Sequence, residues 1–180
     1  FLVLRFYSVS VQSDPGQILA YTLPDGSEVN LNAGSELKYH PFWWRYEREV
    51  RFEGEAFFNV EKGREFSVHS SQGTTIVLGT SFTIFSRQAE YRVACITGSV
   101  KVVSSTEKEV ILSPEYKAII DPSGNIAVTR EKSPETSISW MDGMFRFSAR
   151  QLRLVFDEIE RQYNIDIKFN PSEEFLYTGY

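Results

Sequence analysis

The sequence predicts a mainly β chain, in which a multi-stranded all-β domain is followed by a small β-α-β module of the α+β type. Three observations lead to this fold class. Short runs of alternating apolar and polar residues recur about every ten residues between Gln17 and Arg130. Turn-forming residues separate these runs. A clear helical pattern begins only near Ser148, so a doubly wound parallel sheet is excluded for the first part, and a solenoid-like fold, a sandwich or a barrel remains open.

The predicted strands of the all-β domain show the period of two that a half-buried sheet requires. Within one run, Phe66 and Val68 share a face, while Ser67 and His69 share the other. We expect the strands at residues 18–23, 28–32, 36–39, 48–53, 56–60, 65–70, 75–78, 82–86, 91–96, 99–104, 109–112, 116–121 and 126–130.

Glycine and proline mark the connections between these strands. In Pro24-Asp25-Gly26, the proline presets φ and the glycine tolerates a positive φ. Gly54 and Gly98 each fall between two runs, where we expect a bulge or a sharp corner.

The C-terminal part begins with a change of composition. Residues 133–139 contain a proline and several hydroxyl side chains, which favours a linker or one helical turn. The expected boundaries are therefore an all-β domain at 1–132, a linker at 133–139 and a module at 140–180. Because a module of this size cannot bury a core alone, it either docks on the β domain or continues beyond Tyr180.

Within the module, the pattern predicts strand, helix and strand. A short strand is expected at residues 145–147, followed by a helix whose start carries Ser148 and Gln151 at the spacing of a capping box. Alternation at residues 165–169 predicts the second strand. The helix presents one apolar stripe, made of Leu152, Val155, Phe156, Ile159 and Tyr163.

Composition excludes several classes of function. The net charge is −5, and no run of Lys or Arg could follow a phosphate backbone, so we expect no nucleic-acid partner. The single cysteine, Cys95, lies in a predicted strand and can form neither an internal disulfide nor a thiolate metal site alone. No segment approaches the ~20 apolar residues that span a bilayer. The chain can still be an excised part of a membrane protein.

Chemistry-bearing residues form no recognisable catalytic set. His40 and His69 are interpreted as solvated or hydrogen-bonded structural residues. Glu53 and Glu55 flank Gly54 and share a strand face, as a glycosidase pair could, but such pairs usually come from different segments. Histidine-pair metal motifs and glycine-rich phosphate loops are absent. We therefore expect no enzymatic activity, no catalytic residue, no cofactor and no metal.

One connection is unusually aromatic. Trp43, Trp44 and Tyr46 lie in the segment between two predicted strands, beside Phe42 and Arg45. Such side chains dominate binding hot spots and also stack on sugars, which would make the chain a carbohydrate-binding module. The alternative is a loop that folds over the core and plugs it.

Several motifs, taken in order, resemble the FecR family of transmembrane anti-sigma regulators. LPDGSEVNLNAGS at residues 23–35 is similar to the family signature LPDGxxVxLNAGS, and REVRFEGEAFFNV at 48–60 is similar to REVxLxGEAxFxV. FSVHS at 66–70 and VLGTSFTI at 77–84 continue the series. Residues 140–143, the helix, and residues 163–167 and 177–179 resemble a small secretin/TonB short N-terminal module. The block at 112–118 lacks the family's glycine, and the loop at 42–46 is aromatic where polar residues are expected.

The resemblance implies a relay across the cell envelope. In this family, an outer-membrane TonB-dependent transducer binds an iron chelate or a glycan, and its N-terminal signalling domain contacts the regulator. A cytoplasmic region, which this sequence lacks, then acts on an extracytoplasmic-function sigma factor. The chain is thus expected to be the periplasmic portion of an inner-membrane protein, whose spanning segment is also absent.

A small β-α-β unit suits such a contact because its short strands have edges that accept another strand. The candidate edge residues are Phe145, Arg146 and Phe147 on one strand, and Tyr177, Thr178 and Tyr180 near the C-terminus. Trp43, Trp44 and Tyr46 are the other candidate contact residues. The segment at 133–139 is the candidate hinge between the two parts.

Overall fold

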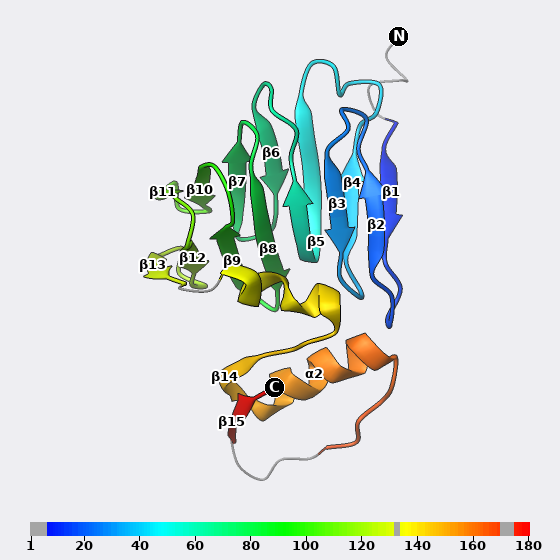
Figure 1. The fold of residues 1–180 in the computed structure, drawn as a ribbon, viewed down its shortest axis with the longest axis vertical. Helices are drawn as coiled ribbons and strands as arrows, with labels where there is room; N and C mark the ends of the chain where they lie inside the picture. Colours follow the sequence, from blue (N-terminus) through cyan, green and yellow to red (C-terminus); the bar gives the residue numbers. More distant parts are fainter. Residues whose placement is uncertain (1–6, 132–133, 170–174) are drawn as a thin grey trace.

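The computed structural model describes residues 7–131, 134–169 and 175–180, and these residues are mainly β (Figure 1). A 13-stranded sheet forms the larger part, and a two-stranded sheet belongs to the C-terminal module. The large sheet contains β1 (Val9–Gln12), β2 (Leu19–Thr22), β3 (Glu28–Leu31), β4 (Glu36–Tyr39), β5 (Arg48–Asn59), β6 (Phe66–His69), β7 (Gly73–Val77), β8 (Ser81–Arg87), β9 (Glu90–Cys95), β10 (Val100–Ser104), β11 (Glu109–Leu112), β12 (Tyr116–Ile120) and β13 (Ile126–Arg130). The predicted mainly β class is confirmed.

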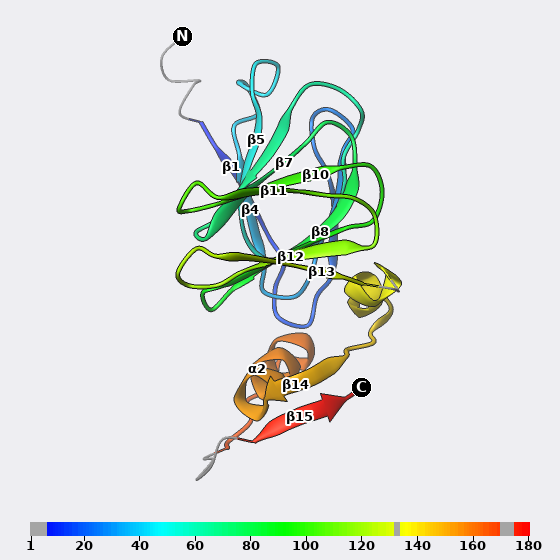
Figure 2. The same cartoon turned by 90° about the vertical axis from the view of Figure 1, so that its left-hand side faces the viewer.

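The large sheet folds into two facing layers (Figure 2). One layer contains β1, β4, β6, β7, β10 and β11, and the other contains β2, β3, β8, β9, β12 and β13. Most strands form a hairpin with a strand next to them in sequence, within one layer, after which the chain crosses to the other layer. The cross-section is therefore that of a sandwich, while successive hairpins advance along the molecule as in a solenoid.

The long strand β5 joins the two layers. Its first part pairs with β4 and β6, and its second part pairs with β3 and β8. Gly54 lies between these parts with a φ of +126°, and a Cβ at this position would overlap the side chain of Ser35. Only glycine permits this backbone conformation and this approach. The corner expected at Gly54 is confirmed, and the two strands predicted at 48–53 and 56–60 are one bent strand.

The core lies between the layers and is rich in aromatic side chains. Every second residue of β5 is buried, as the period of a strand requires. Phe58 stacks on Phe82 with ring centroids 5.2 Å apart and meets Phe52 edge-on at 5.5 Å. Burial of each such ring stabilises the fold by roughly 1.5–3 kcal/mol. These contacts connect both layers through one cluster.

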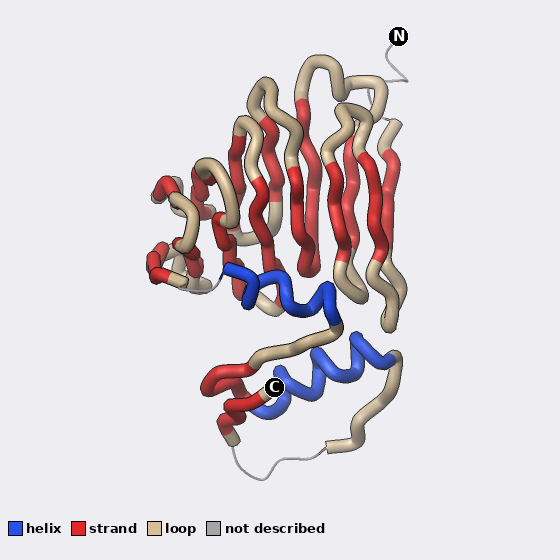
Figure 3. Tube along the Cα trace, in the orientation of Figure 1, coloured by secondary structure: helices blue, strands red, loops and turns tan. Residues whose placement is uncertain are grey.

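The C-terminal module follows a 3₁₀ helix, η1 (Pro134–Asp142), and contains β14 (Phe147–Gln151), α2 (Leu152–Tyr163) and β15 (Leu176–Gly179). β14 and β15 pair antiparallel, and α2 packs on them. The predicted β-α-β module is thus confirmed. Figure 3 shows both helical segments at the end of the sandwich that faces the module.

The module docks on the end of the sandwich through polar contacts. Gly16 N donates to Arg161 O at 2.7 Å, and Gln162 Nε2 donates to Asn32 Oδ1 at 2.7 Å. Gln88 Nε2 donates to Asp157 Oδ2 at 2.9 Å. These contacts dock the module on the β domain, which is one of the two ways in which so small a unit could be supported.

Two details of the predicted module are wrong. Ser148 and Gln151 do not form a capping box, because both lie in β14, and the side chain of Gln151 makes no cap hydrogen bond. The predicted strand at 145–147 overlaps β14 only at Phe147. Pairing with β15, which is distant in sequence, makes residues 147–151 a strand, although the local pattern predicts the start of a helix there.

Residues 165–169 form no strand either. Asn164 ends α2 in the left-handed conformation, which asparagine tolerates at a helix C-terminus, and the chain turns back along the helix. Ile167 N then donates to Glu160 Oε1 at 2.7 Å, and Phe169 packs edge-on against Phe156 at 4.7 Å. The alternating segment therefore packs against α2. The second strand of the module comes later, as β15.

Candidate protein-interaction groove

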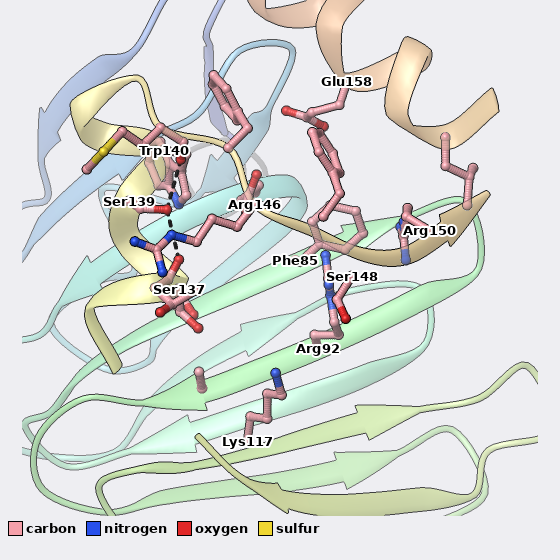
Figure 4. Close-up of a pocket in the computed structure, with 18 of the residues that line it drawn as sticks. Phe85, Arg92, Lys117, Ser137, Ser139, Trp140, Arg146, Ser148, Arg150 and Glu158 are labelled. Carbon is pink, nitrogen blue, oxygen red and sulfur yellow. Dashed lines mark hydrogen bonds between the residues drawn. The ribbon is translucent and has the colours of Figure 1, made fainter. Parts of the chain in front are cut away.

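A groove of about 830 Å³ separates the outer face of the sandwich from the C-terminal module (Figure 4). Strands β8, β9 and β12 form one wall through Phe85, Arg92 and Lys117. The segment from η1 to β14, the helix α2 and the end of β15 form the other walls. The groove thus exists only because the module docks on the sandwich.

Two arginines and a phenylalanine in this groove are held in place by contacts with one another. The guanidinium of Arg92 lies 4.1 Å from the ring centroid of Phe85, and that of Arg150 lies 5.9 Å from the same ring. Glu90 holds both, with its carboxylate 3.2 Å from Arg92 Nε and 2.6 Å from Arg150 Nη2. Burial alone would raise the pKa of Glu90, but these two arginines hold that pKa below its usual value. One carboxylate therefore serves two cations, one from each side of the groove.

Arg146 and Lys117 also face the groove and are held less closely by carboxylates. Arg146 is exposed and, within the described part of the chain, forms no ion pair; its side chain extends toward Ser137 and Ser139 (Figure 4). Lys117 Nζ lies 3.5 Å from Glu131 Oε1 and remains about one-third exposed, at 32%. The charge of the groove is therefore more positive than that of the whole chain.

The floor of the groove contains a pair of acidic side chains between the sandwich and α2. Asn32 Nδ2 donates to Glu55 Oε2 at 2.7 Å. Glu158, only 8% exposed, accepts from Arg161 Nη2 at 2.6 Å and from Gln162 Nε2 at 2.8 Å. Burial and the nearby charge of Glu158 raise the pKa of Glu55 above its usual value. The contact between module and sandwich is thus a network of ionisable groups.

Five of the residues predicted at the strand edges line this groove, namely Phe145, Arg146, Phe147, Thr178 and Tyr180. The sixth, Tyr177, packs its ring against Phe147 at 6.1 Å and stays exposed. The structure therefore brings this predicted set together, although it places most of them in β15 or in the approach to β14 and not in a strand at 145–147.

The aromatic loop lies elsewhere. The connection between β4 and β5 is at the end of the sandwich opposite α2 (Figure 1). Trp44 is buried, at 5% exposure, and packs edge-on against Tyr39 and Phe66 at 5.4 Å and 5.9 Å, so this ring plugs the core and offers no contact surface. Trp43 and Tyr46 remain nearer the surface, with ring centroids 4.8 Å apart and planes tilted by 43°.

The residues considered for catalysis make structural contacts. His40 Nδ1 lies 3.1 Å from Tyr7 O, and His69 Nδ1 lies 3.2 Å from Thr74 Oγ1. Glu53 accepts from Ser71 N at 2.8 Å and from Ser86 Oγ at 2.9 Å. Among residues 7–131, 134–169 and 175–180, no group of three or more His, Cys, Asp or Glu side chains could hold a metal ion. Nor is any helix in those ranges long and apolar enough to cross a bilayer.

The sequence did not predict the residues that give the groove its positive charge and hold its side chains in place. Phe85, Arg92 and Lys117 are ordinary outward-facing residues of strands, and Arg150 and Glu158 belong to the module. No spacing links them, because they converge only when the module docks.

Comparisons with known proteins agree with this fold. The sequence model of the FecR protein family matches residues 9–101. A crystal structure at 1.65 Å resolution, described as a candidate anti-sigma factor from Parabacteroides distasonis, is 30% identical, with a TM-score of 0.86 over 95% of this chain and 83% of that chain. This chain belongs to the FecR family. A second structure of that description, at 2.50 Å resolution, is 29% identical, with a TM-score of 0.85 over 95% of this chain and 84% of the other. No curated protein matches the chain.

Membership of the FecR family assigns the chain a role in signalling. The family is regulatory rather than catalytic, and its members are typically membrane-associated sensors.

Proposed function

We propose that this chain is the periplasmic signalling portion of an inner-membrane anti-sigma regulator and has no enzymatic activity. In this proposal, the N-terminal signalling domain of an outer-membrane TonB-dependent transducer contacts the C-terminal module. A cytoplasmic region outside this sequence passes the signal to an extracytoplasmic-function sigma factor. FecR family membership and the similarity to two structures described as candidate anti-sigma factors support this role.

The observation that carries the proposal is the free edges of the module's small sheet. β14 and β15 pair only with each other in the described structure, so each has one edge without a strand partner. Such edges bind an incoming strand through backbone hydrogen bonds, and pockets for alternate side chains provide specificity. Aromatic side chains that line the adjoining groove, such as Phe145 and Tyr180, supply apolar contact area.

The proposed signal also needs a movable joint. We propose that residues 133–139 are the hinge and that the parts at 1–132 and 140–180 are separate domains. The polar nature of the docking contacts supports movement, since polar interfaces within a chain resemble transient protein contacts. From this segment, residues 134–139 lie in η1.

Binding to a transducer tests the proposal. The chain should co-purify with the N-terminal signalling domain of a TonB-dependent transducer encoded beside it, and calorimetry should give a one-to-one complex. A chain that ends before Ser148 is the matched control and should lose the complex. Failure of the complete chain to bind any neighbouring transducer's signalling domain would count against the proposal.

Carbohydrate binding has less support from the geometry. Trp44 is in the core, and the tilt of 43° between Trp43 and Tyr46 leaves no flat platform for a sugar ring. Calorimetry against a glycan panel, with Trp43→Ala as control, distinguishes the two functions. Heat that disappears in that variant would favour the carbohydrate-binding module.

A further inference from the structure

We infer that the groove beside the module binds an acidic, extended peptide segment, which lies along the free edge of β14 with its carboxylates on Arg146, Lys117 and the Arg92–Arg150 pair. This inference rests on the proposed function, since it specifies the chemistry of the partner at the same site. Each of its parts comes from the geometry of the groove.

The edge that borders the groove belongs to β14. Figures 1 and 2 both show β14 between β15 and the sandwich, so the side of β14 that does not pair with β15 faces the sandwich. A volume of about 830 Å³ lies in the range of about 300–1,000 Å³ that ligand sites occupy, and residues 145–148 and Arg150, in and just before β14, line it. A peptide strand can therefore lie there with its backbone on β14.

The groove's own carboxylates pair with only some of its cations: Glu158 pairs with Arg161, and Glu131 lies 3.5 Å from Lys117. Arg146 has no ion pair in the described chain, and Arg92 and Arg150 share the single carboxylate of Glu90. The nearest acid to Lys117 is 3.5 Å away. Burial raises the pKa of Glu55 on the groove floor, so this acid resists carrying a charge that would repel an acidic ligand. Incoming carboxylates would thus pair with Arg146, which has none in the described chain, and would add a second carboxylate where Arg92 and Arg150 share one.

These cations are also preorganised. Stacking on Phe85 and the contact with Glu90 hold the guanidinium groups of Arg92 and Arg150 in place before a ligand arrives. Guanidinium groups match carboxylates in planar, often bidentate pairs, and a fixed guanidinium loses less conformational entropy on binding. Apolar rings that also line the groove, such as Phe147, suit the alternate apolar side chains of an extended acidic segment.

The net charge of the whole chain would repel an acidic ligand, so binding depends on the positive charge within the groove. The net charge of −5 opposes approach by an acidic peptide, so general electrostatic attraction cannot cause its binding. An acidic peptide that binds must therefore use a local cationic site. In the described chain, five cationic side chains from two parts of the fold line the groove: Arg92, Lys117, Arg146, Arg150 and Arg161.

A pair of model peptides tests the inference. An eight-residue peptide of alternating glutamate and valine should bind the complete chain at least tenfold more tightly than the matched lysine–valine peptide in low salt. The difference should shrink as salt rises, because the contacts are partly exposed. Equal affinity for both peptides, or no binding of either, would overturn the inference.

Matched variants locate the site. Arg146→Gln should weaken binding of the acidic peptide about tenfold, through the loss of charge-assisted hydrogen bonds, and Arg146→Lys should restore part of it. Arg51→Gln is the control, because Arg51 is an exposed arginine of β5 that lies outside the groove. Arg146 is exposed, so its variants should fold as the parent does. An Arg51→Gln effect equal to that of Arg146→Gln would contradict the assigned site.

The two proposals can fail separately. If a transducer's signalling domain binds but neither Arg146→Gln nor salt changes its affinity, the acidic-segment inference is wrong and the signalling role stands. If no signalling domain binds while the acidic peptide does, the groove chemistry stands and the transducer is the wrong partner.

Discussion

Gly54 is the residue whose local chemistry most clearly determines the fold. It has a φ of +126° at the point where β5 passes from one layer to the other, and its Cα faces Ser35 without room for a side chain. The sequence predicts this corner because the glycine interrupts a run of alternating residues. The closeness of Ser35 has no local signal, since Ser35 belongs to another strand connection.

Gly54→Ala should lower the free energy of unfolding by about 3 kcal/mol or more, because backbone strain and a side-chain overlap add together. Gly143→Ala is the control. Gly143 also has a positive φ, of +72°, but a Cβ at that position would have no atom within 4 Å. Strain alone should lower stability by about 1 kcal/mol. Urea denaturation of both variants measures the difference; equal losses would mean that Ser35 does not restrict this corner.

Glu55 gives the docked state a dependence on pH. Its neighbours are Glu158 from α2, Asn32 from the loop after β3, and Arg87 and Arg92 from β8 and β9; Arg161 from α2 in turn faces Arg87. Because the folded state raises its pKa, Glu55 favours folding most at acidic pH. That contribution is lost as pH rises through the raised value.

Glu55→Gln should therefore make the chain more stable than the parent at pH 7.5 and should flatten this pH dependence. The amide oxygen can still accept the hydrogen bond from Asn32. Glu49→Gln, at an exposed acid of the same strand, is the matched control. Urea denaturation at pH 5 and pH 7.5 provides the comparison, and a variant less stable than the parent at pH 7.5 would show that ionised Glu55 strengthens docking.

At the scale of elements, alternation in the sequence predicts most strands, because both layers bury one face against a shared core. β1 is missed, since Val9–Gln12 is a four-residue segment whose place depends on pairing with β4. The module is harder to predict. Ser148 has the spacing of a helix cap but belongs to β14, and residues 165–169 alternate yet pack along α2. In both cases a partner distant in sequence decides the structure.

The corrected helix start gives a direct test. Ser148→Ala should change stability by less than about 0.5 kcal/mol, whereas loss of a true cap costs about 1 kcal/mol. Asn164→Ala should lower stability by about 1 kcal/mol, because Asn164 ends α2 in the left-handed conformation with a φ of +52°. Thermal melts followed by circular dichroism measure both changes. A larger loss of stability in Ser148→Ala would indicate that Ser148 caps the helix after all.

At the scale of the whole molecule, the two candidate surfaces lie at opposite ends of the sandwich (Figure 1). The aromatic loop closes one end of the core, while the module docks at the other and creates the cationic groove. The sequence predicts the candidate edge residues from the short strands expected in the module. It does not predict Arg92, Arg150 or Glu90 as their neighbours, because only docking brings strands of the sandwich against β14.

The central claim is that partners bind at the module and its groove. The most direct measurement is an amide NMR titration of the complete chain with the signalling domain of a neighbouring TonB-dependent transducer. Shifts should concentrate at residues 145–151 and 176–180 and at Arg92 and Lys117. Shifts confined to the aromatic loop at residues 40–47, or no shifts at any residue, would contradict the account.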